Sequence, residues 1–185
     1  MKKEILITLG DSITAGWPYE QEFSWVNSLQ ENLINKCIMN KGVSGDTFGD
    51  MLLRFEKDVL SYEPEYCFVM GGANEAYQHI PQTVLRENFL KLIAELRKIS
   101  CNIIVGIPSP VEDDLMEKYL QDIRKWLTGY CHTNNIPTLD FYTLMLDADN
   151  RIDHTFFVDG CHPNKKGYEL MGEYALRKLA ELKIT

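Results

Sequence analysis

Short apolar segments alternate along the chain with longer segments in which apolar residues recur every three or four positions. The short segments are typical of β-strands buried on both faces, and the longer ones of helices with one apolar face. The expected strands are Ile5–Leu9, Cys37–Met39, Tyr66–Met70, Asn102–Ile107 and Thr138–Phe141. The expected helices are Trp25–Lys36, a segment from Asp46 or Thr47 to about Leu60, Thr83–Ile99, Asp114–Asn134 and, capped by Asn164, Lys165–Leu182.

This alternation predicts an α/β fold in which a five-stranded parallel sheet carries helices on both faces. No linker, repeat or charge block divides the sequence, so residues 1–185 are expected to form one domain. A domain of this size buries roughly 70% of the surface that its unfolded chain exposes. Ligands of such sheets bind beyond the carboxyl ends of the strands, and a functional site is expected at that edge.

Charge and composition narrow the possible partners. The chain has 19 Lys and Arg against 27 Asp and Glu, a net charge of −8. Because such a chain repels phosphate backbones, nucleic acid is not an expected partner. No apolar run approaches the roughly 20 residues of a membrane-spanning helix. Five scattered cysteines without a Cys-x-x-Cys pair indicate reduced thiols and a cytoplasmic protein.

Four polar, glycine-containing segments lie at the expected strand ends or just before the last helix. They are Gly10-Asp11-Ser12, Asn40 to Thr47, Gly71-Gly72-Ala73-Asn74-Glu75 and Asp159-Gly160-Cys161-His162-Pro163-Asn164. In this order and spacing, the set resembles the SGNH subgroup of the GDSL hydrolases, a family of esterases and lipases. The resemblance extends over nearly the whole chain and implies a flavodoxin-like three-layer α/β/α sandwich.

The residue types in these segments suit ester cleavage, which needs a nucleophile, a base and a group that orients the base. Ser12, on a turn after a strand, is the expected nucleophile, His162 the base and Asp159 its orienting partner. The resemblance implies an oxyanion hole made by the backbone N–H groups of Ser12 and Gly45 and the side-chain amide of Asn74. No cofactor and no metal are expected.

Two positions depart from the family pattern. Glu75 replaces the aspartate that often follows the asparagine, and we expect a changed loop contact there rather than lost activity. Cys161 replaces a more usual aliphatic residue, and it is either buried and inert or sensitive to thiol reagents. Asp11 is expected to make structural hydrogen bonds in the nucleophile turn.

A metal site is an alternative interpretation of the segment before the last helix. Residues of the types that can bind zinc occur there within ten positions, namely Asp153, His154, Asp159, Cys161 and His162. The side chains of two adjacent residues diverge, however, and no pair has the i, i+4 spacing of ligands on one helix face. The spacing therefore favours the hydrolase interpretation.

Aromatic residues and prolines in the loops of the active edge are candidates for the wall of a substrate pocket. The candidates are Trp17, Tyr77, Pro108 and Phe156. The predicted function is hydrolysis of a short acyl ester, such as an acetyl ester, of a small metabolite or carbohydrate through an acyl-enzyme. A thioesterase or lysophospholipase is the alternative enzymatic function. A module that binds a small ligand without catalysis is the non-enzymatic alternative. The oligomeric state stays open.

Overall fold

A computed structural model describes residues 3–184 of the chain. Within this range five strands form one sheet in the order β2-β1-β3-β4-β5, and every neighbouring pair is parallel. The strands are β1 (Glu4–Gly10), β2 (Lys36–Gly42), β3 (Tyr66–Val69), β4 (Asn102–Ile107) and β5 (Thr138–Asp140). This strand order is that of flavodoxin-like folds, so the predicted fold class is confirmed.

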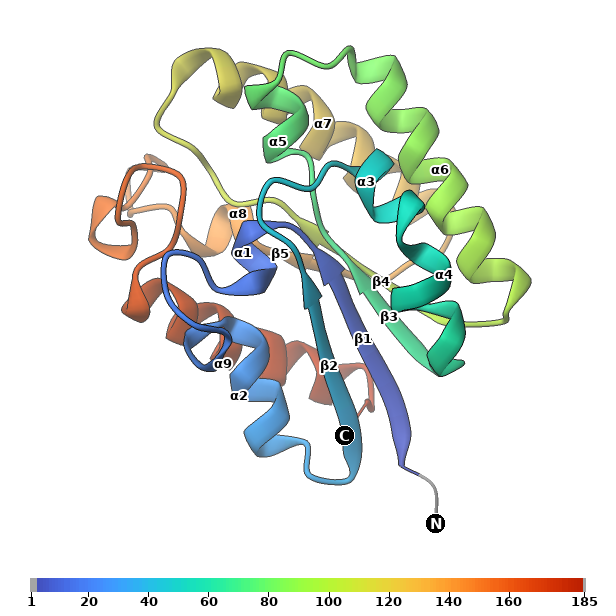
Figure 1. Ribbon diagram of the computed structural model, residues 1–185. Helices are drawn as coiled ribbons and strands as arrows, with labels where there is room; N and C mark the ends of the chain where they lie inside the picture. The colour runs from blue at the N-terminus through green and yellow to red at the C-terminus, as the bar shows by residue number, and fades with distance from the viewer. Residues whose placement is uncertain (1–2, 185) are drawn as a thin grey trace.

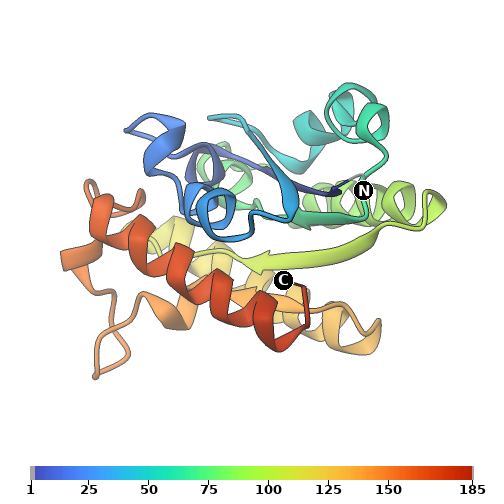
Figure 2. The same cartoon turned by 90° about the horizontal axis from the view of Figure 1, so that it is seen from below.

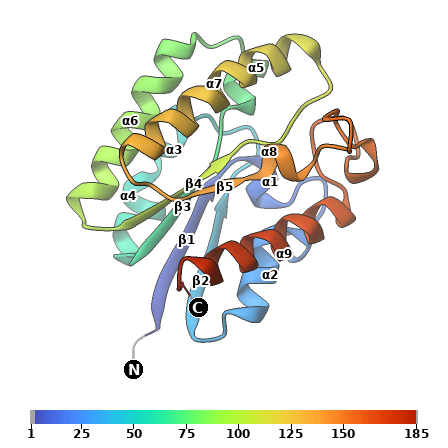
Figure 3. The same cartoon turned by 180° about the vertical axis from the view of Figure 1, so that it is seen from behind.

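Helices cover both faces of the sheet and give three layers (Figures 1 and 3). One face carries α2 (Trp25–Asn32) and α9 (Lys165–Glu181), which lie side by side. The other face carries α3 (Phe48–Leu53), α4 (Phe55–Asp58), α6 (Gln82–Lys98) and α7 (Asp114–Thr133). Figure 2 shows α9 along one side of the sheet, seen from below.

The alternation of side chains along β1 explains why both faces need a helical layer. Ile7 and Leu9 pack into the core under α3, α6 and α7, whereas Leu6 packs into the core under α2 and α9. Successive side chains of a strand point to opposite faces, so an apolar strand buries both only between two layers. Each of these three side chains is at most 1% exposed.

Two predicted helices are shorter in the structure than the sequence pattern indicated. The helix that begins at Trp25 ends at Asn32, and Ile34, predicted to be helical, lies outside it and is 68% exposed. The helix predicted from Thr47 to about Leu60 is interrupted at Arg54, which separates α3 from α4. The long helices α6, α7 and α9 begin and end within a residue of their predicted bounds.

Candidate functional site

The carboxyl ends of β1, β2 and β3 bring three of the four polar segments to one edge of the sheet. Because β1 lies between β2 and β3, the Ser12 turn has the other two segments as its neighbours. A short helix follows the first segment, α1 (Ser12–Ala15), and another begins in the third, α5 (Ala73–Tyr77). The pairing of Gly10 with Gly42 and of Leu9 with Val69 fixes the register in which these segments meet.

Ser12 is the first residue of α1, and its turn is held by the residue before it. The Asp11 carboxylate accepts the Ile13 N–H at 3.0 Å and so caps the helix, which confirms the structural hydrogen bond expected for Asp11. The Ser12 side chain reaches the segment before α9, and its Oγ lies 3.0 Å from Nε2 of His162. Ser12 is buried, with 8% of its surface exposed, and it lines a cavity.

His162 is oriented by Asp159 through two kinds of hydrogen bond. Its ring Nδ1 lies 3.0 Å from Oδ2 of Asp159, and Oδ1 accepts the backbone N–H groups of His162 and Cys161. The glycine between the two, Gly160, has φ +75°, a left-handed conformation that glycine adopts at no steric cost. The carboxylate therefore holds both the turn and the ring.

Asp159 is held in its ionised form. Partial burial opposes ionisation, but the hydrogen bonds from the backbone and the ring of His162 and from the N–H of Cys161 outweigh it, so the pKa of Asp159 lies below its ordinary value. An ionised Asp159 keeps the proton of the imidazole on Nδ1. Nε2 is then the ring atom that can accept a proton from Ser12.

The three residues expected to form the oxyanion hole lie in the segments that follow β1, β2 and β3, and two of them, Ser12 and Asn74, line one cavity. Gly45 has φ +90°, and among the described residues other than its two chain neighbours nothing lies within 4 Å of the place where a Cβ would stand. Asn74, in the first turn of α5, lines the same cavity as Ser12, and its Nδ2 donates to the carbonyl of Asp46 at 2.9 Å. The amide of Asn74 is thereby tied to the residue that follows Gly45.

Glu75 joins α5 to α3. Its side chain is buried, and its Oε1 accepts the Phe48 N–H at 2.7 Å, next to the Thr47–Asp50 capping box at the start of α3. Burial raises the pKa of this carboxyl above its ordinary value, although the Phe48 N–H opposes the effect. The loop contact expected at this position is thus an added cap on α3.

A cavity of about 520 Å³ opens beside Ser12, His162 and Asn74. Its apolar wall includes Tyr77, one of the pocket candidates, and also four residues that were not candidates, namely Ile13, Ala73, Val111 and Met116. Met116 follows the predicted start of a helix and Val111 follows Pro110, but no local pattern distinguishes either residue from a core position. Glu112 and Asp113 add carboxyl groups to the lining.

The other three pocket candidates are not among the residues that line this cavity. The Trp17 ring packs against the His162 ring, and Trp17 is not among the residues that line the cavity. Neither Pro108 nor Phe156 lines this cavity: the Pro108 carbonyl accepts the Nε–H of Arg124, and Phe156 packs against the core under α9. In both cases a contact with another segment, invisible in the local sequence, turns the residue away.

The segment considered as a metal site is engaged in hydrogen bonds. The Asp153 carboxylate caps the 3₁₀ turn His154–Phe156, and Nδ1 of His154 lies 4.0 Å from Glu112. Both ring nitrogens of His162 already face Ser12 and Asp159. Among residues 3–184, no three Asp, Glu, His or Cys side chains gather in a way that could hold a metal ion.

The cysteines are free, and each of the five lies in the described range. Cys161 is half-buried, lines the cavity and packs with Ala76, Val111 and Leu120. Burial raises the pKa of its thiol to about 12, and the charges of Asp11 and Asp159 act in the same direction. In the part of the chain that the structure describes, no helix is both long and apolar enough to cross a membrane.

Comparison with known proteins assigns the chain to a family. The sequence model of the GDSL-like lipase/acylhydrolase family matches residues 8–170. An arylesterase of Vibrio mimicus is 29% identical over 182 residues, which cover 96% of this chain and 89% of the relative. The uncharacterized lipoprotein YqeF of Bacillus subtilis is 36% identical over 107 residues, 51% of this chain and 44% of the relative.

The fold has a close structural counterpart. The solved structure of a G-D-S-L-family protein from Desulfitobacterium hafniense superimposes with a TM-score of 0.88 at 29% identity and covers 96% of this chain and all of its own. The family model spans all four polar segments and reaches from β1 into the first turns of α9. The chain therefore belongs to the GDSL-like lipase/acylhydrolase family, whose members hydrolyse ester bonds.

Proposed function

We propose that the protein is a serine esterase in which Ser12 is the nucleophile, His162 the general base and Asp159 the residue that orients the base. One observation carries the proposal: Ser12 Oγ lies 3.0 Å from His162 Nε2, while Nδ1 of the same ring lies 3.0 Å from Asp159. These distances are within hydrogen-bond reach, which is the first requirement of a nucleophile and its base.

In the proposed reaction, Oγ of Ser12 bonds to the ester carbonyl carbon as its proton passes to Nε2 of His162. The carbonyl oxygen becomes an oxyanion, which accepts hydrogen bonds from the N–H groups of Ser12 and Gly45 and from the Asn74 amide. The C–O bond to the alcohol then breaks, and His162 returns the proton to the leaving oxygen. Water, deprotonated by the same histidine, hydrolyses the acyl-enzyme and regenerates Ser12.

The cavity supports a small, uncharged or cationic ester as substrate. Its wall beside Ser12 is mainly apolar, and carboxyl groups of Glu112, Asp113 and Asp159 stand in its lining, so a negatively charged acyl group meets repulsion there. We retain a short acyl group, such as acetyl on a small metabolite or carbohydrate, as the proposed substrate class. The Vibrio mimicus relative, an arylesterase, supports ester cleavage without naming this acyl group.

A thioesterase or lysophospholipase activity is the alternative that substrate profiling separates. p-Nitrophenyl esters from acetate to palmitate, followed by a panel of acetylated sugars, measure the preferred acyl length. A maximum of kcat/KM at acetate or butyrate supports the proposed class, whereas a maximum at long chains supports the alternative. p-Nitrophenyl succinate tests the expected discrimination against an anionic acyl group.

A fluorophosphonate probe tests the nucleophile directly. It should label the wild-type protein at Ser12, and Ser12→Ala should lose both labelling and turnover of p-nitrophenyl acetate. Ser109→Ala is the matched control, because Ser109 is a buried serine of the loop after β4 that does not line the cavity. Hydrolysis that persists in Ser12→Ala would instead indicate a binding module with background reactivity.

The proposed location is the cytoplasm, because the five cysteines are free thiols. The lipoprotein relative in Bacillus subtilis represents the competing location outside the cytoplasmic membrane. Fractionation of the source cells, with detection of the native protein by antibody, distinguishes the two.

A further inference from the structure

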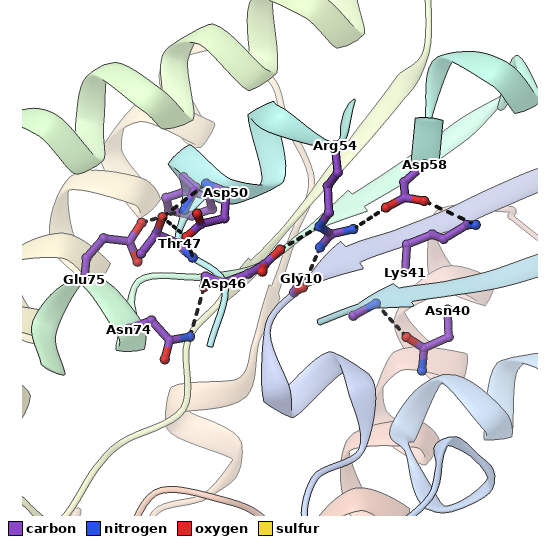
Figure 4. Close-up of polar contacts among 12 residues, drawn as sticks. Gly10, Asn40, Lys41, Asp46, Thr47, Asp50, Arg54, Asp58, Asn74 and Glu75 are labelled. Carbon is purple, nitrogen blue, oxygen red and sulfur yellow. Dashed lines mark hydrogen bonds and ion pairs between the residues drawn. The ribbon is translucent and has the colours of Figure 1, made fainter. Parts of the chain in front are cut away.

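One side chain, that of Arg54, bonds to the end of β1, to the loop after β2 and to α4 (Figure 4). Its Nη2 donates to the carbonyl of Gly10 at 3.0 Å, two residues before Ser12. Its Nε donates to Oδ2 of Asp46 at 2.6 Å, directly after Gly45. Its Nη1 donates to Oδ2 of Asp58 at 3.0 Å. A single guanidinium thus spans the loop after β2 and the end of β1.

The connection continues to the third expected oxyanion donor. Asp46 receives Arg54 on its side chain and Asn74 on its backbone carbonyl, at 2.6 and 2.9 Å. Each of the three expected oxyanion donors is thus close to an Arg54 contact. Ser12 is two residues after Gly10, Gly45 directly precedes Asp46, and the Asn74 amide donates to the Asp46 carbonyl. Arg54 itself does not line the cavity, so it does not touch the substrate.

The local fold explains how the guanidinium reaches this place. Arg54 ends α3 and begins α4, with φ −104° and ψ 5°, at the break in what the sequence predicted as one continuous helix. The Thr47–Asp50 capping box fixes the start of α3 just after the loop. The side chains of Arg54, Asp46 and Asp58 are only 12–15% exposed, so solvent screens these charged hydrogen bonds weakly.

We propose that Arg54 is a positioning residue of the oxyanion hole, an inference that rests on the proposed serine esterase function. By fixing Asp46 against Gly10, it sets the spacing between the Ser12 and Gly45 N–H groups and the placement of the Asn74 amide. Stabilisation of an oxyanion depends on donors held in place before charge develops, and a displacement of about 1 Å can cost on the order of 100-fold in rate.

The three acceptors explain why an arginine serves this role. They lie around one planar guanidinium, which presents its N–H groups in a fixed fork, whereas a lysine ammonium is a point charge on a flexible stem. Arg54→Lys should therefore keep the charge but lose part of the geometry. We expect kcat to fall about 10- to 100-fold in Arg54→Ala and less in Arg54→Lys, with KM changed less than threefold in both.

A double-mutant cycle with Asn74→Ala tests the proposal on p-nitrophenyl acetate. Because Arg54 acts partly through the Asn74 amide, its replacement should cost measurably less in the Asn74→Ala background than in the wild type. A role in general stability predicts instead the same fold-change in both backgrounds, or none once kcat is corrected for the folded fraction. Either of these outcomes overturns the proposal. If Arg54→Ala does not fold, Arg54→Lys carries the same comparison.

Two controls separate this inference from the proposed function. Lys36→Met removes a partly buried ion pair with Glu4 at the opposite end of the same sheet, and it should lower stability while leaving kcat unchanged. Ser12→Ala tests the esterase mechanism itself. Turnover that survives in Ser12→Ala would refute the function, whereas an inactive Ser12→Ala together with an unimpaired Arg54→Ala would refute only the positioning role.

Discussion

The indole of Trp17 lies against the imidazole of His162, with ring centroids 4.2 Å apart and ring planes inclined by 52°. The backbone at Trp17 is itself fixed, because the hydroxyl of the buried Tyr168 donates to the Trp17 carbonyl at 2.6 Å. The imidazole is therefore held on three sides, by Asp159, by Ser12 and by an aromatic face that is 40% exposed.

Loss of the Trp17 ring should make the orientation of the His162 imidazole less well fixed while leaving the imidazole in place. We expect Trp17→Ala to lower kcat/KM for p-nitrophenyl acetate about tenfold, a fraction of what a general base contributes, and Trp17→Phe to stay within a few-fold of the wild type. Phe23→Ala is the control, since Phe23 is an exposed aromatic of the following turn that packs on Tyr19. Equal effects in Trp17→Ala and Phe23→Ala would contradict a specific role for Trp17.

The fold was predictable wherever the pattern of apolar residues reflects burial between layers. Ile7 and Leu9 mark β1 in the sequence because a strand covered on both faces has few polar positions. The break at Arg54 was not predictable, because three acceptors from other segments hold the side chain and the local sequence remains compatible with a continuous helix. The short helix α5 has five residues, too few to show a period.

The candidate site followed the same division. Ser12, His162 and Asn74 could be placed at one edge, because parallel strands end together and each segment follows or precedes a regular element. The residues that line the cavity could not be predicted, because they come from several segments of the chain that meet only in the folded structure. Tyr77 faces the cavity, whereas Pro108 is turned to Arg124, and nothing adjacent to either residue in the sequence distinguishes them.

Removal of the Asn74 amide should slow the chemical step more than it weakens binding. Charge on the carbonyl oxygen appears only as Ser12 attacks, so a donor aimed at it acts mainly on the transition state. We expect kcat of Asn74→Ala to fall by about 10²–10³, with KM changed only a few-fold. Asn74→Asp should be at least as impaired, because a carboxylate would repel the oxyanion.

Steady-state kinetics, corrected for the folded fraction by thermal melting, measure this effect. Gln78→Ala provides the control, because Gln78 is an exposed residue at the end of the same helix, α5. Near-normal kcat in folded Asn74→Ala, combined with a lowered melting temperature, would make Asn74 a turn residue only.

The buried carboxyl of Asp11 should make stability depend on pH between about 4 and 7. Burial, together with the nearby Glu75 and Asp46, raises the pKa of Asp11 from 3.8 to about 7, against the Ile13 N–H. Across this window the unfolded chain has lost the proton and the folded chain keeps it. The contribution of Asp11 to the free energy of unfolding is thus complete below pH 4. It declines by about 1.4 kcal/mol per pH unit as the pH rises to 7, which amounts to a few kcal/mol.

Asp11→Asn removes this titration and keeps an oxygen that can accept the Ile13 N–H. The difference in unfolding free energy between Asp11→Asn and the wild type should therefore shift in favour of the variant from pH 4 to 7 and then level off. Urea unfolding at a series of pH values gives the difference, and Asp122→Asn, on the exposed face of α7, is the matched control. A pH-independent difference would show that Asp11 is ionised throughout.

Cys161 should resist alkylation although it lines the cavity. The thiolate is the reactive form, and a pKa of about 12 leaves roughly one molecule in 10⁴ ionised at pH 8. Iodoacetamide at pH 8 should leave ester hydrolysis intact, and mass spectrometry should find Cys161 modified only after denaturation. Rapid labelling of Cys161 in the folded protein, with parallel loss of activity, would contradict this expectation.

The distance along the chain between Ser12 and His162 affects how the activity arises during synthesis. The two residues are 150 positions apart, and the segment that carries His162 follows β5. Protein chains fold from the N-terminus as they are made. A nascent chain can therefore form the sheet that carries Ser12 before His162 has been synthesised. Turnover of a fluorogenic ester during translation in vitro would then mark the moment at which α9 docks beside α2, and unfinished chains would leave cellular esters untouched.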